Sequence, residues 1–260
     1  MNEEKYDLGN GDGMKIPKGK FGTWLENFLY HYKWHTIVAL FLIVTVTICS
    51  VQMCSKDSYD VYVMYAGSRD IKSMKNEGDV SEFSKVYKSL TEVTEDFDGN
   101  GENMPSLEAL YMLSSEEIKK IEEELNEKKE NGEGSYELNY TLLSSNNQTF
   151  RDRMTYSEFY VCILSESLYS SYKTFDGVSM FTPLEKYVEE ECEVRYLDGS
   201  AIYLNSTGLS SLPGFSEMPE DTVICLRSLS AISSHFDKKG NEELYRNSEK
   251  VIKNMINYGK

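Results

Sequence analysis

The stretch HYKWHTIVALFLIVTVTICSVQMCSK, residues 31–56, decides how the chain is organised. Between His35 and Lys56, residues 36–55 carry no charged side chain. As an α-helix that rises about 1.5 Å per residue, this run covers roughly 30 Å, the thickness of the hydrocarbon core of a bilayer. The sequence therefore predicts a transmembrane helix over residues 36–55 that binds the lipid bilayer directly.

A cleaved secretion signal and a lipid attachment site are the alternatives to a permanent span. The apolar region of a cleaved signal has about 7 to 15 residues and is followed by small residues, whereas this run is longer and ends in SVQMCSK. Cys54 follows the apolar run, as the modified cysteine of a bacterial lipoprotein does. Because residues 51–53 (VQM) are not the small residues of a lipobox, we expect an uncleaved anchor, and acylation of Cys54 is the alternative.

Aromatic side chains are concentrated just before the span. They are Phe21, Trp24, Phe28, Tyr30, Tyr32 and Trp34. Amphipathic rings of this kind settle at the level of the lipid headgroups. Residues 21–35 are therefore expected to form an amphipathic aromatic juxtamembrane segment that leads into the span.

The orientation of the span decides where the rest of the chain lies. Lysine and arginine near the span are in excess by one on its amino-terminal side, and the side with more positive charge usually faces the cytoplasm. Residues 1–20 are polar and glycine-containing, as expected of the cytosolic end of an uncleaved signal anchor. We expect residues 1–20 to be a cytoplasmic tail and residues 56–260 an extracytoplasmic domain of a single-pass protein of the cell membrane.

The negative charge of the chain lies in residues 56–260. The net charge is −16, and residues 1–35 contribute five acidic and five basic side chains, which cancel. Such an acidic surface repels nucleic acid and attracts cations, so no nucleic acid partner is expected. Residues 56–260 are enough for one well-buried domain and too few for two.

The cysteines do not predict a disulfide scaffold. Cys162, Cys192 and Cys225 lie in the predicted domain, so at least one thiol has no partner within it. Cys162 and Cys225 fall inside predicted apolar strands, where a cysteine is most often a small buried hydrophobic residue.

Apolar runs alternate with amphipathic helical patterns along residues 56–260. The run YDVYVMYAG, residues 59–67, is apolar almost throughout, which is typical of a strand covered on both faces. Further strands are predicted at residues 105–113, 137–144, 158–165, 201–205 and 222–228. Helices are predicted to follow the N-cap residues Asp79, Ser114, Thr182 and Asn241. This alternation favours a single layered α/β domain.

Two segments resemble known families. LYHYKWHTIVALFLIVTVTICSVQMCS followed by YDVYVMYAG resembles the anchor and first strand of uncharacterised single-span, membrane-anchored extracytoplasmic proteins of Gram-positive bacteria. Residues 146–188 are similar in layout to one segment of extracytoplasmic solute-binding proteins. The second resemblance implies an α/β domain related to one lobe of the periplasmic-binding-protein fold.

The predicted strands point to one candidate ligand site. In an open α/β sheet, ligands bind beyond the carboxyl ends of the strands. Arg69 follows the strand at 59–67, and Ser165, Glu166 and Ser167 end or follow the strand at 158–165. These four residues are candidate ligand-binding residues, and the alternative is that Ser165 only caps a helix.

A second candidate site is the acidic segment EDFDGNGE, residues 95–102. Asp96, Asp98 and Asn100 occupy the first, third and fifth positions of a calcium loop, with glycine sixth. The twelfth position is Leu107 rather than glutamate. Because aspartate, asparagine and glycine also form ordinary turns, the alternative is a plain acidic turn. The candidate calcium ligands are Asp96, Asp98, Asn100 and Glu102.

Catalytic chemistry is not apparent in the sequence. His235 is the only histidine of residues 56–260, and no HExxH, GxSxG, P-loop or dinucleotide-binding motif is present. We therefore expect a non-enzymatic interaction, assembly or accessory module whose partner is another membrane or cell-surface protein. The alternative is a membrane-tethered receptor lobe for a solute or a cation. No cofactor is expected apart from calcium.

Overall fold

The computed structural model describes residues 20–54, 59–73, 81–131, 137–156, 159–175, 177–229 and 238–259. The chain divides into two compact units, Met1–Asp57 and Ser58–Lys260. Each unit is considered by itself.

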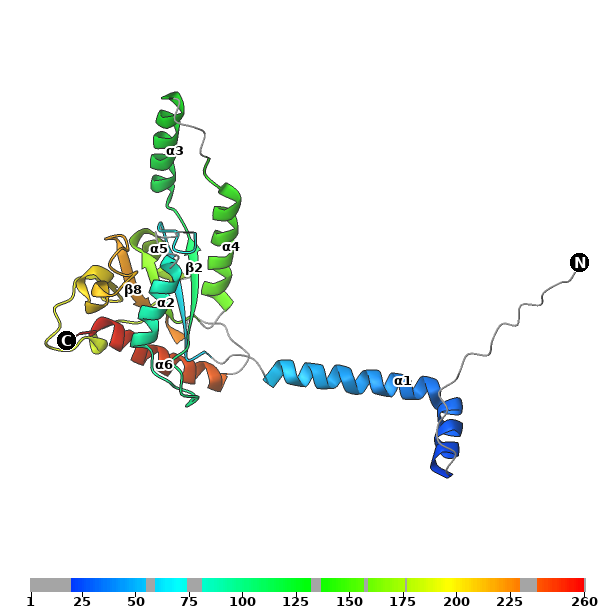
Figure 1. Cartoon of the computed structure of the whole chain (residues 1–260). Helices are drawn as coiled ribbons and strands as arrows, with labels where there is room; N and C mark the ends of the chain where they lie inside the picture. The colour runs from blue at the N-terminus through cyan, green and yellow to red at the C-terminus, as the bar shows by residue number, and fades with distance from the viewer. Residues whose placement is uncertain are drawn as a thin grey trace, which may run out of the picture. The chain divides into compact units, whose positions relative to one another are not determined.

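The first unit contains one long helix, α1 (Lys20–Cys54). Its backbone leaves helical geometry at Tyr32 (φ −117°, ψ 15°), so two helices meet at a kink (Figure 1). Before the kink, the ring of Phe28 stacks on those of Trp24 and Tyr32, with centroids 5.6 Å and 5.2 Å apart. Within the described part of the chain, Tyr30–Ser50 is the one helix long and apolar enough to cross a membrane. It overlaps the predicted span.

The second unit is built on a six-stranded sheet. Its strands are β1 (Val61–Gly67), β2 (Pro105–Tyr111), β3 (Val161–Ser165), β6 (Tyr196–Asp198), β7 (Ala201–Tyr203) and β8 (Thr222–Leu226). They lie in the order β2-β1-β3-β8-β7-β6. β1 is parallel to β2 and β3, whereas β8 is antiparallel to β3 and β7, and β7 to β6. The unit is therefore a mixed α/β domain, which confirms the predicted class.

Helices cover both faces of this sheet (Figure 1). The helices are α2 (Glu82–Val93), α3 (Ser115–Glu130), α4 (Tyr140–Tyr156), α5 (Glu166–Tyr172) and α6 (Lys238–Ile256). α2 and α6 pack on one face, and α4 and α5 on the other. Shorter elements are β4 (Thr174–Phe175), β5 (Val178–Ser179), η1 (Glu185–Tyr187), η2 (Leu204–Ser206) and η3 (Gly208–Ser211).

The central strand shows why two layers of helices are needed. Successive side chains of a strand point to opposite faces. Val63 and Tyr65 of β1 join the core beneath α2 and α6, while Met64 and Ala66 join the core beneath α4 and α5. All four are buried. The apolar run at residues 59–67 is therefore a strand covered on both faces, as the sequence predicts.

The strand predicted at residues 137–144 is wrong, because this segment begins the helix α4. The side chain of Asn139 accepts a hydrogen bond from the backbone N–H of Leu142 at 3.0 Å, as a helix N-cap does. Leu143, Phe150 and Met154 are the buried residues of α4. They recur at helical spacing, which the short window at 137–144 could not reveal.

The predicted helix starts are partly correct. Ser114 and Glu117 form the predicted capping box of α3. Ser81, not Asp79, caps α2, and α6 begins at Lys238, so Asn241 lies inside it. Asp79 itself and His235 lie outside the described residues.

The helix predicted after Thr182 is reduced to the single 3₁₀ turn η1. The backbone N–H of Thr182 donates to Leu226, and that of Leu184 donates to Gly199. Residues 182–184 are therefore tied to neighbouring segments instead of starting an α-helix.

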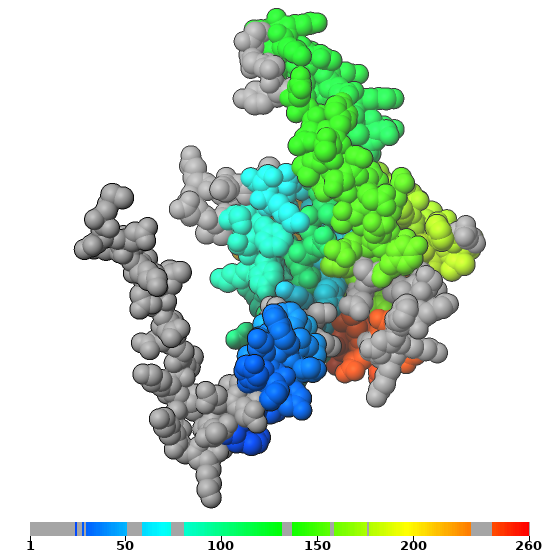
Figure 2. Space-filling model, turned by 90° about the vertical axis from the view of Figure 1, so that its right-hand side faces the viewer, coloured from blue at the N-terminus to red at the C-terminus, as the bar shows by residue number. Residues whose placement is uncertain are grey.

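The helix α3 and the first part of α4 form an arm that projects from the rest of this unit (Figures 1 and 2). α3 has no buried residue. The arm is joined to the body where α4 buries Phe150 and Met154. We call α3 together with residues 137–149 the helical arm.

Gly214 offers a test of the packing between α2 and the loop before β8. Its φ is +83°, and an added Cβ would lie 2.7 Å from Cγ2 and 2.8 Å from the backbone nitrogen of Val86. Gly214→Ala is expected to destabilise the domain by about 2 to 4 kcal/mol, since it adds a clash to an unfavourable backbone conformation. Urea unfolding of the full chain in detergent measures this loss.

Gly177 is the matched control, because its φ is +77° and nothing lies within 4 Å of an added Cβ. Gly177→Ala is expected to cost only about 1 to 2 kcal/mol of backbone strain. Equal losses for the two variants would show that the contact with Val86 relaxes without cost.

Candidate functional site

The carboxyl ends of β1 and β3 meet at one edge of the sheet. β1 lies between β2 and β3 in the sheet. The chain passes from β1 to β2 on one side and then crosses to β3 on the other side, so the strand order reverses between β1 and β3. Open α/β sheets bind ligands at such a switch point. The register pairs Ala66 with Leu164, which places the residues after both strands at this edge. Arg69 and residues 165–167 therefore lie where the sequence predicts them.

Arg69 belongs to a network of charged side chains at this edge. Its Nη2 lies 2.6 Å from Oε2 of Glu217 and 3.5 Å from Oε2 of Glu82. Nζ of Lys85 lies 3.1 Å from Oε1 of Glu82 and 3.6 Å from Oε1 of Glu217. Two cations thus balance two carboxylates around the buried Glu82. The network joins β1, the start of α2 and the loop before β8, which gives Arg69 a structural role.

The three residues predicted after β3 have partners of their own. Ser165 occupies the N-cap position of the short helix α5, and its hydroxyl lies 3.1 Å from that of Ser167. The hydroxyl of Tyr203 donates to Oε2 of Glu166 at 2.7 Å. This bond raises the pKa of Tyr203. Glu166 and Arg69 therefore bind different partners rather than each other.

Asp221 is a residue of this edge that the sequence analysis missed. Its carbonyl oxygen accepts a hydrogen bond from the backbone N–H of Glu166 at 2.8 Å. Burial raises the pKa of the Asp221 carboxyl, and the negative charges of Glu117 and Glu166 raise it further. The acidic side chains at this edge favour a cation over an anion. Sequence analysis could not place Asp221 here, because its position depends on the antiparallel direction of β8.

The predicted calcium segment forms a tight turn held by its own carboxylates. Asp96 accepts hydrogen bonds from the backbone N–H groups of Gly99, Asn100 and Gly101 at 2.7 Å, 3.1 Å and 2.8 Å. Asp98 accepts from the backbone N–H of Asn100, and Oδ1 of Asn100 accepts from that of Glu102. Asp96, Asp98 and Asn100 are therefore gathered in one loop, where they also stabilise the turn. Glu102 contributes its backbone N–H to this turn, and its carboxylate is not part of the converging group.

Asp60, immediately before β1, joins this loop. It is buried, and its two carboxylate oxygens accept from the backbone N–H groups of Phe97 and Met104, both at 2.7 Å. Carboxylate oxygens of Asp60, Asp96 and Asp98 lie within 4.8 Å of one another, close enough to hold a metal ion. Oxygen ligands of this type suit calcium. Asp60 was missed because it is distant from the loop in the sequence.

A small cavity of about 180 Å³ lies beside this loop. It is lined by Tyr59, Asp60, Phe97, Asp98, Glu243, Leu244 and Asn247. Glu243 and Asn247, on α6, line this cavity. The cavity is therefore bounded by the acidic loop, by Asp60 and by α6.

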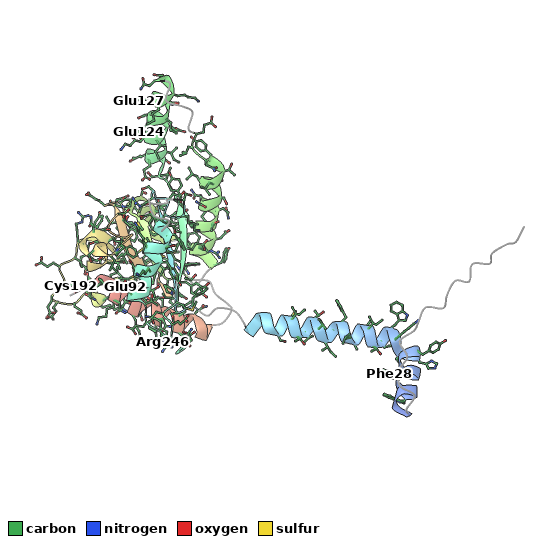
Figure 3. The ribbon with its side chains drawn as sticks, in the orientation of Figure 1. Phe28, Glu92, Glu124, Glu127, Cys192 and Arg246 are labelled. Carbon is green, nitrogen blue, oxygen red and sulfur yellow. The ribbon has the colours of Figure 1, made fainter. Side chains whose placement is uncertain are left out.

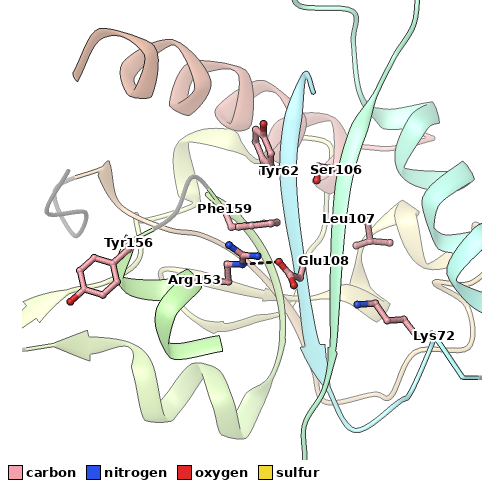
Figure 4. Close-up of a pocket in the computed structure, with 8 residues that line it drawn as sticks. All are labelled: Tyr62, Lys72, Ser106, Leu107, Glu108, Arg153, Tyr156 and Phe159. Atoms are coloured by element: carbon pink, nitrogen blue, oxygen red, sulfur yellow. Dashed lines mark hydrogen bonds and ion pairs between the residues drawn. The ribbon is translucent and has the colours of Figure 1, made fainter. Parts of the chain in front are cut away.

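A larger groove of about 430 Å³ lies between the strands β1 and β2 and the end of α4 (Figure 4). Arg153 reaches from α4 to Glu108 on β2, with Nε 2.8 Å from Oε2. The guanidinium of Arg153 also lies over the ring of Phe159, 5.6 Å from its centroid. Lys72, Tyr62 and Tyr156 contribute further polar groups to the walls. The groove is mainly polar, and its central cation and anion neutralise each other.

Comparison of this chain with protein-family models, with curated proteins and with solved structures finds no match in any of the three. The resemblances described under the sequence analysis therefore stay predictions.

Proposed function

We propose that this chain is a single-pass membrane protein that displays its acidic α/β domain outside the cytoplasm as a non-enzymatic interaction or assembly module. The observation that carries the proposal is the helix at Tyr30–Ser50, which is long and apolar enough to span a bilayer and has no buried residues. An apolar surface of this length exposed to water would be strongly unfavourable. A bilayer removes that cost.

Three threonines within this helix form hydrogen bonds to its own backbone. The hydroxyls of Thr36, Thr45 and Thr47 donate to the carbonyl oxygens of Tyr32, Phe41 and Ile43, at 3.0 Å, 2.9 Å and 2.8 Å. In a hydrocarbon environment an unsatisfied polar group costs several kcal/mol. These bonds support insertion of the helix, and the aromatic stack before the kink suits the headgroup level.

The helical arm supports the role in interaction. α3 carries seven glutamates and four lysines and buries none of its side chains, so its surface is available to a partner (Figure 3). The domain as a whole is acidic. A partner that carries a basic surface would be attracted by this charge, and the association would weaken as salt is added. The proposed partner is therefore a membrane or cell-surface protein with a basic face.

The anchoring and the orientation can be tested together. The full chain is expected to stay in the membrane fraction after alkaline carbonate extraction, and residues 58–260 to be digested by protease added to intact protoplasts. Ile43→Lys puts a charge in the middle of the span at a cost of about 2.5 to 3.5 kcal/mol and should reduce the membrane-bound fraction, whereas Ile43→Ala should not. A domain protected from protease in intact protoplasts would contradict the orientation.

The arm can be tested with a photo-crosslinking amino acid introduced in living cells. Glu124 and Glu127 are exposed on α3, and Arg246 is an exposed control on α6 (Figure 3). Crosslinkers at positions 124 and 127 are expected to give a discrete crosslinked complex with the partner, and the yield of this complex should fall as the salt concentration is raised. A crosslinker at position 246 should not give this complex. Equal products at all three positions, or none on the arm, would contradict a role of the arm in binding.

A membrane-tethered cation receptor is the second candidate function. It is favoured by the convergence of Asp60, Asp96 and Asp98 beside a small cavity. The other receptor alternative, a solute site between Arg69 and Glu166, gains less support, because Arg69 pairs with Glu217 and Glu166 with Tyr203 instead of the two converging on one space.

Calcium binding predicts a rise in melting temperature, since a ligand selective for the folded state stabilises it. At a calcium concentration 100 times the dissociation constant, the gain is about 2.7 kcal/mol. Asp96→Ala should abolish the shift, whereas Glu95→Ala, which leaves the three converging carboxylates in place, should keep it. A shift that survives in Asp96→Ala would show that calcium acts elsewhere.

A further inference from the structure

Two cysteines face each other at the seam between the parallel and antiparallel halves of the sheet. β3 is the last strand of the parallel half, and β8 is antiparallel to it. In this pair of strands, Cys162 is the direct partner of Cys225. Both side chains are fully buried in the core beneath α4 and α5, on the same face of the sheet.

The hydrogen bonds at both ends of the strand pair define the type of this cysteine pair. The backbone N–H of Arg227 donates to Tyr160, and that of Glu166 donates to Asp221, each at 2.8 Å. Hydrogen-bonded and non-hydrogen-bonded pairs alternate along antiparallel strands. Counting inward from either end makes Cys162 and Cys225 a hydrogen-bonded pair, whose Cα atoms are about 5.5 Å apart.

This spacing is compatible with a disulfide, whose Cα atoms lie about 4.4 to 6.8 Å apart. The thiol of Cys225 already reaches across to the opposite residue, because its Sγ donates to the carbonyl oxygen of Cys162 at 3.6 Å. The Cβ atoms of a directly opposed pair are up to about 5.5 Å apart, and a disulfide needs about 3.5 to 4.5 Å. A local approach of about 1 Å would therefore bring the two sulfur atoms into bonding range.

We propose that Cys162 and Cys225 form a cross-strand disulfide when the domain folds in the presence of a disulfide donor. The proposal rests on the proposed extracytoplasmic location, because disulfides persist in oxidising compartments and are rare in the cytosol. The bond would join the two halves of the sheet covalently. Cys192 is buried elsewhere and keeps its thiol.

The chemistry is a thiol–disulfide exchange with an external disulfide, such as oxidised glutathione or an oxidised dithiol protein. One cysteine thiolate attacks the donor and forms a mixed disulfide, and the first donor thiolate leaves. The second cysteine thiolate then attacks the protein sulfur of the mixed disulfide and releases the second donor thiolate. The two protons lost by the cysteines end on the two donor thiols, so the protein is oxidised and the donor is reduced by two electrons.

Burial determines when this exchange can happen. Burial raises the pKa of the Cys225 thiol, and its hydrogen bond with Cys162 raises it further. The thiolate is the reactive form, so the folded and reduced pair reacts slowly. Oxidation therefore belongs to the folding step, before the core beneath α4 and α5 closes over the two sulfur atoms.

The test uses the full chain, unfolded with guanidinium and reductant and refolded in detergent with either reduced glutathione alone or a mixture with oxidised glutathione. The samples are then quenched with acid, free thiols are alkylated in denaturant, and peptides are mapped by mass spectrometry. The oxidised arm is expected to give a linked pair of peptides containing residues 162 and 225, with a loss of two hydrogen atoms, while Cys192 is alkylated. The same mixture added after refolding should give much less of the linked pair.

Variants of the three cysteines show which two form the disulfide. Cys192→Ser should keep the linked pair, and Cys162→Ala or Cys225→Ala should lose it. The peptide map of the unsubstituted chain decides the matter even if a variant fails to fold. Full alkylation of both cysteines after oxidative refolding, or a link that involves Cys192, would overturn the proposal.

A measurement in cells separates this proposal from the proposed location. Cells are quenched with acid to trap the redox state, free thiols are alkylated with a maleimide in denaturant, and the same peptides are mapped. A linked pair in cells supports both proposals. If the pair forms on oxidative refolding but is fully alkylated in cells, the pairing stands and the exported location is contradicted.

Discussion

The adjacent strands β1, β3 and β8 are buried on both faces, and the rest of the domain is arranged around this constraint. All residues of β3 and β8 are buried, and in β1 only Tyr62 is partly exposed. Strands buried on both faces need two layers of cover. α2 with α6, and α4 with α5, supply them. β2, at one end of the sheet, is only partly buried, and the groove lined by Glu108 and Arg153 opens beside it.

Elements with strong local signals could be predicted from the sequence. The apolar run of β1 and the capping box of α3 each depend on residues close together in the chain. The strand expected at residues 137–144 was wrong because a short apolar window fits a strand or a helix equally well. The helix is favoured by the N-cap at Asn139 and by Phe150, which is buried but lies beyond the window. The direction of β8 depends on how the chain returns between residues 166 and 221, for which no periodic pattern exists.

The same distinction applies to the candidate sites. The turn at Asp96 was recognisable because its hydrogen bonds link residues only a few positions apart. Asp60 was not, because its contacts with the loop depend on the tertiary fold. Arg69 was correctly placed at the edge of the sheet, but its partner Glu217 is 148 positions away. The sequence therefore predicts the position of Arg69 at this edge of the sheet, but not the ion pairs that give it a structural role.

The helical arm is buried at its base and exposed at its tip. This difference favours an interaction module over a receptor that closes on a ligand. At the base, the fully buried Arg227 donates from Nη1 to the carbonyl oxygens of Arg153 and Met154, at 2.6 Å and 2.8 Å. A cation at the carboxyl end of a helix also interacts favourably with the helix dipole. The tip buries no side chain of α3.

A receptor cleft needs polar groups that remain available to the ligand, and at the switch point Arg69 and Glu166 are already engaged. On the arm, α3 buries no side chain, and Glu122 accepts a hydrogen bond from the hydroxyl of Tyr140 of the same arm, while the base is joined to the core by α4. A partner could therefore bind the arm through charge without rearranging the sheet. The proposed function therefore rests on the exposed surface of α3, which is joined to the core through the base of α4, rather than on an enclosed site.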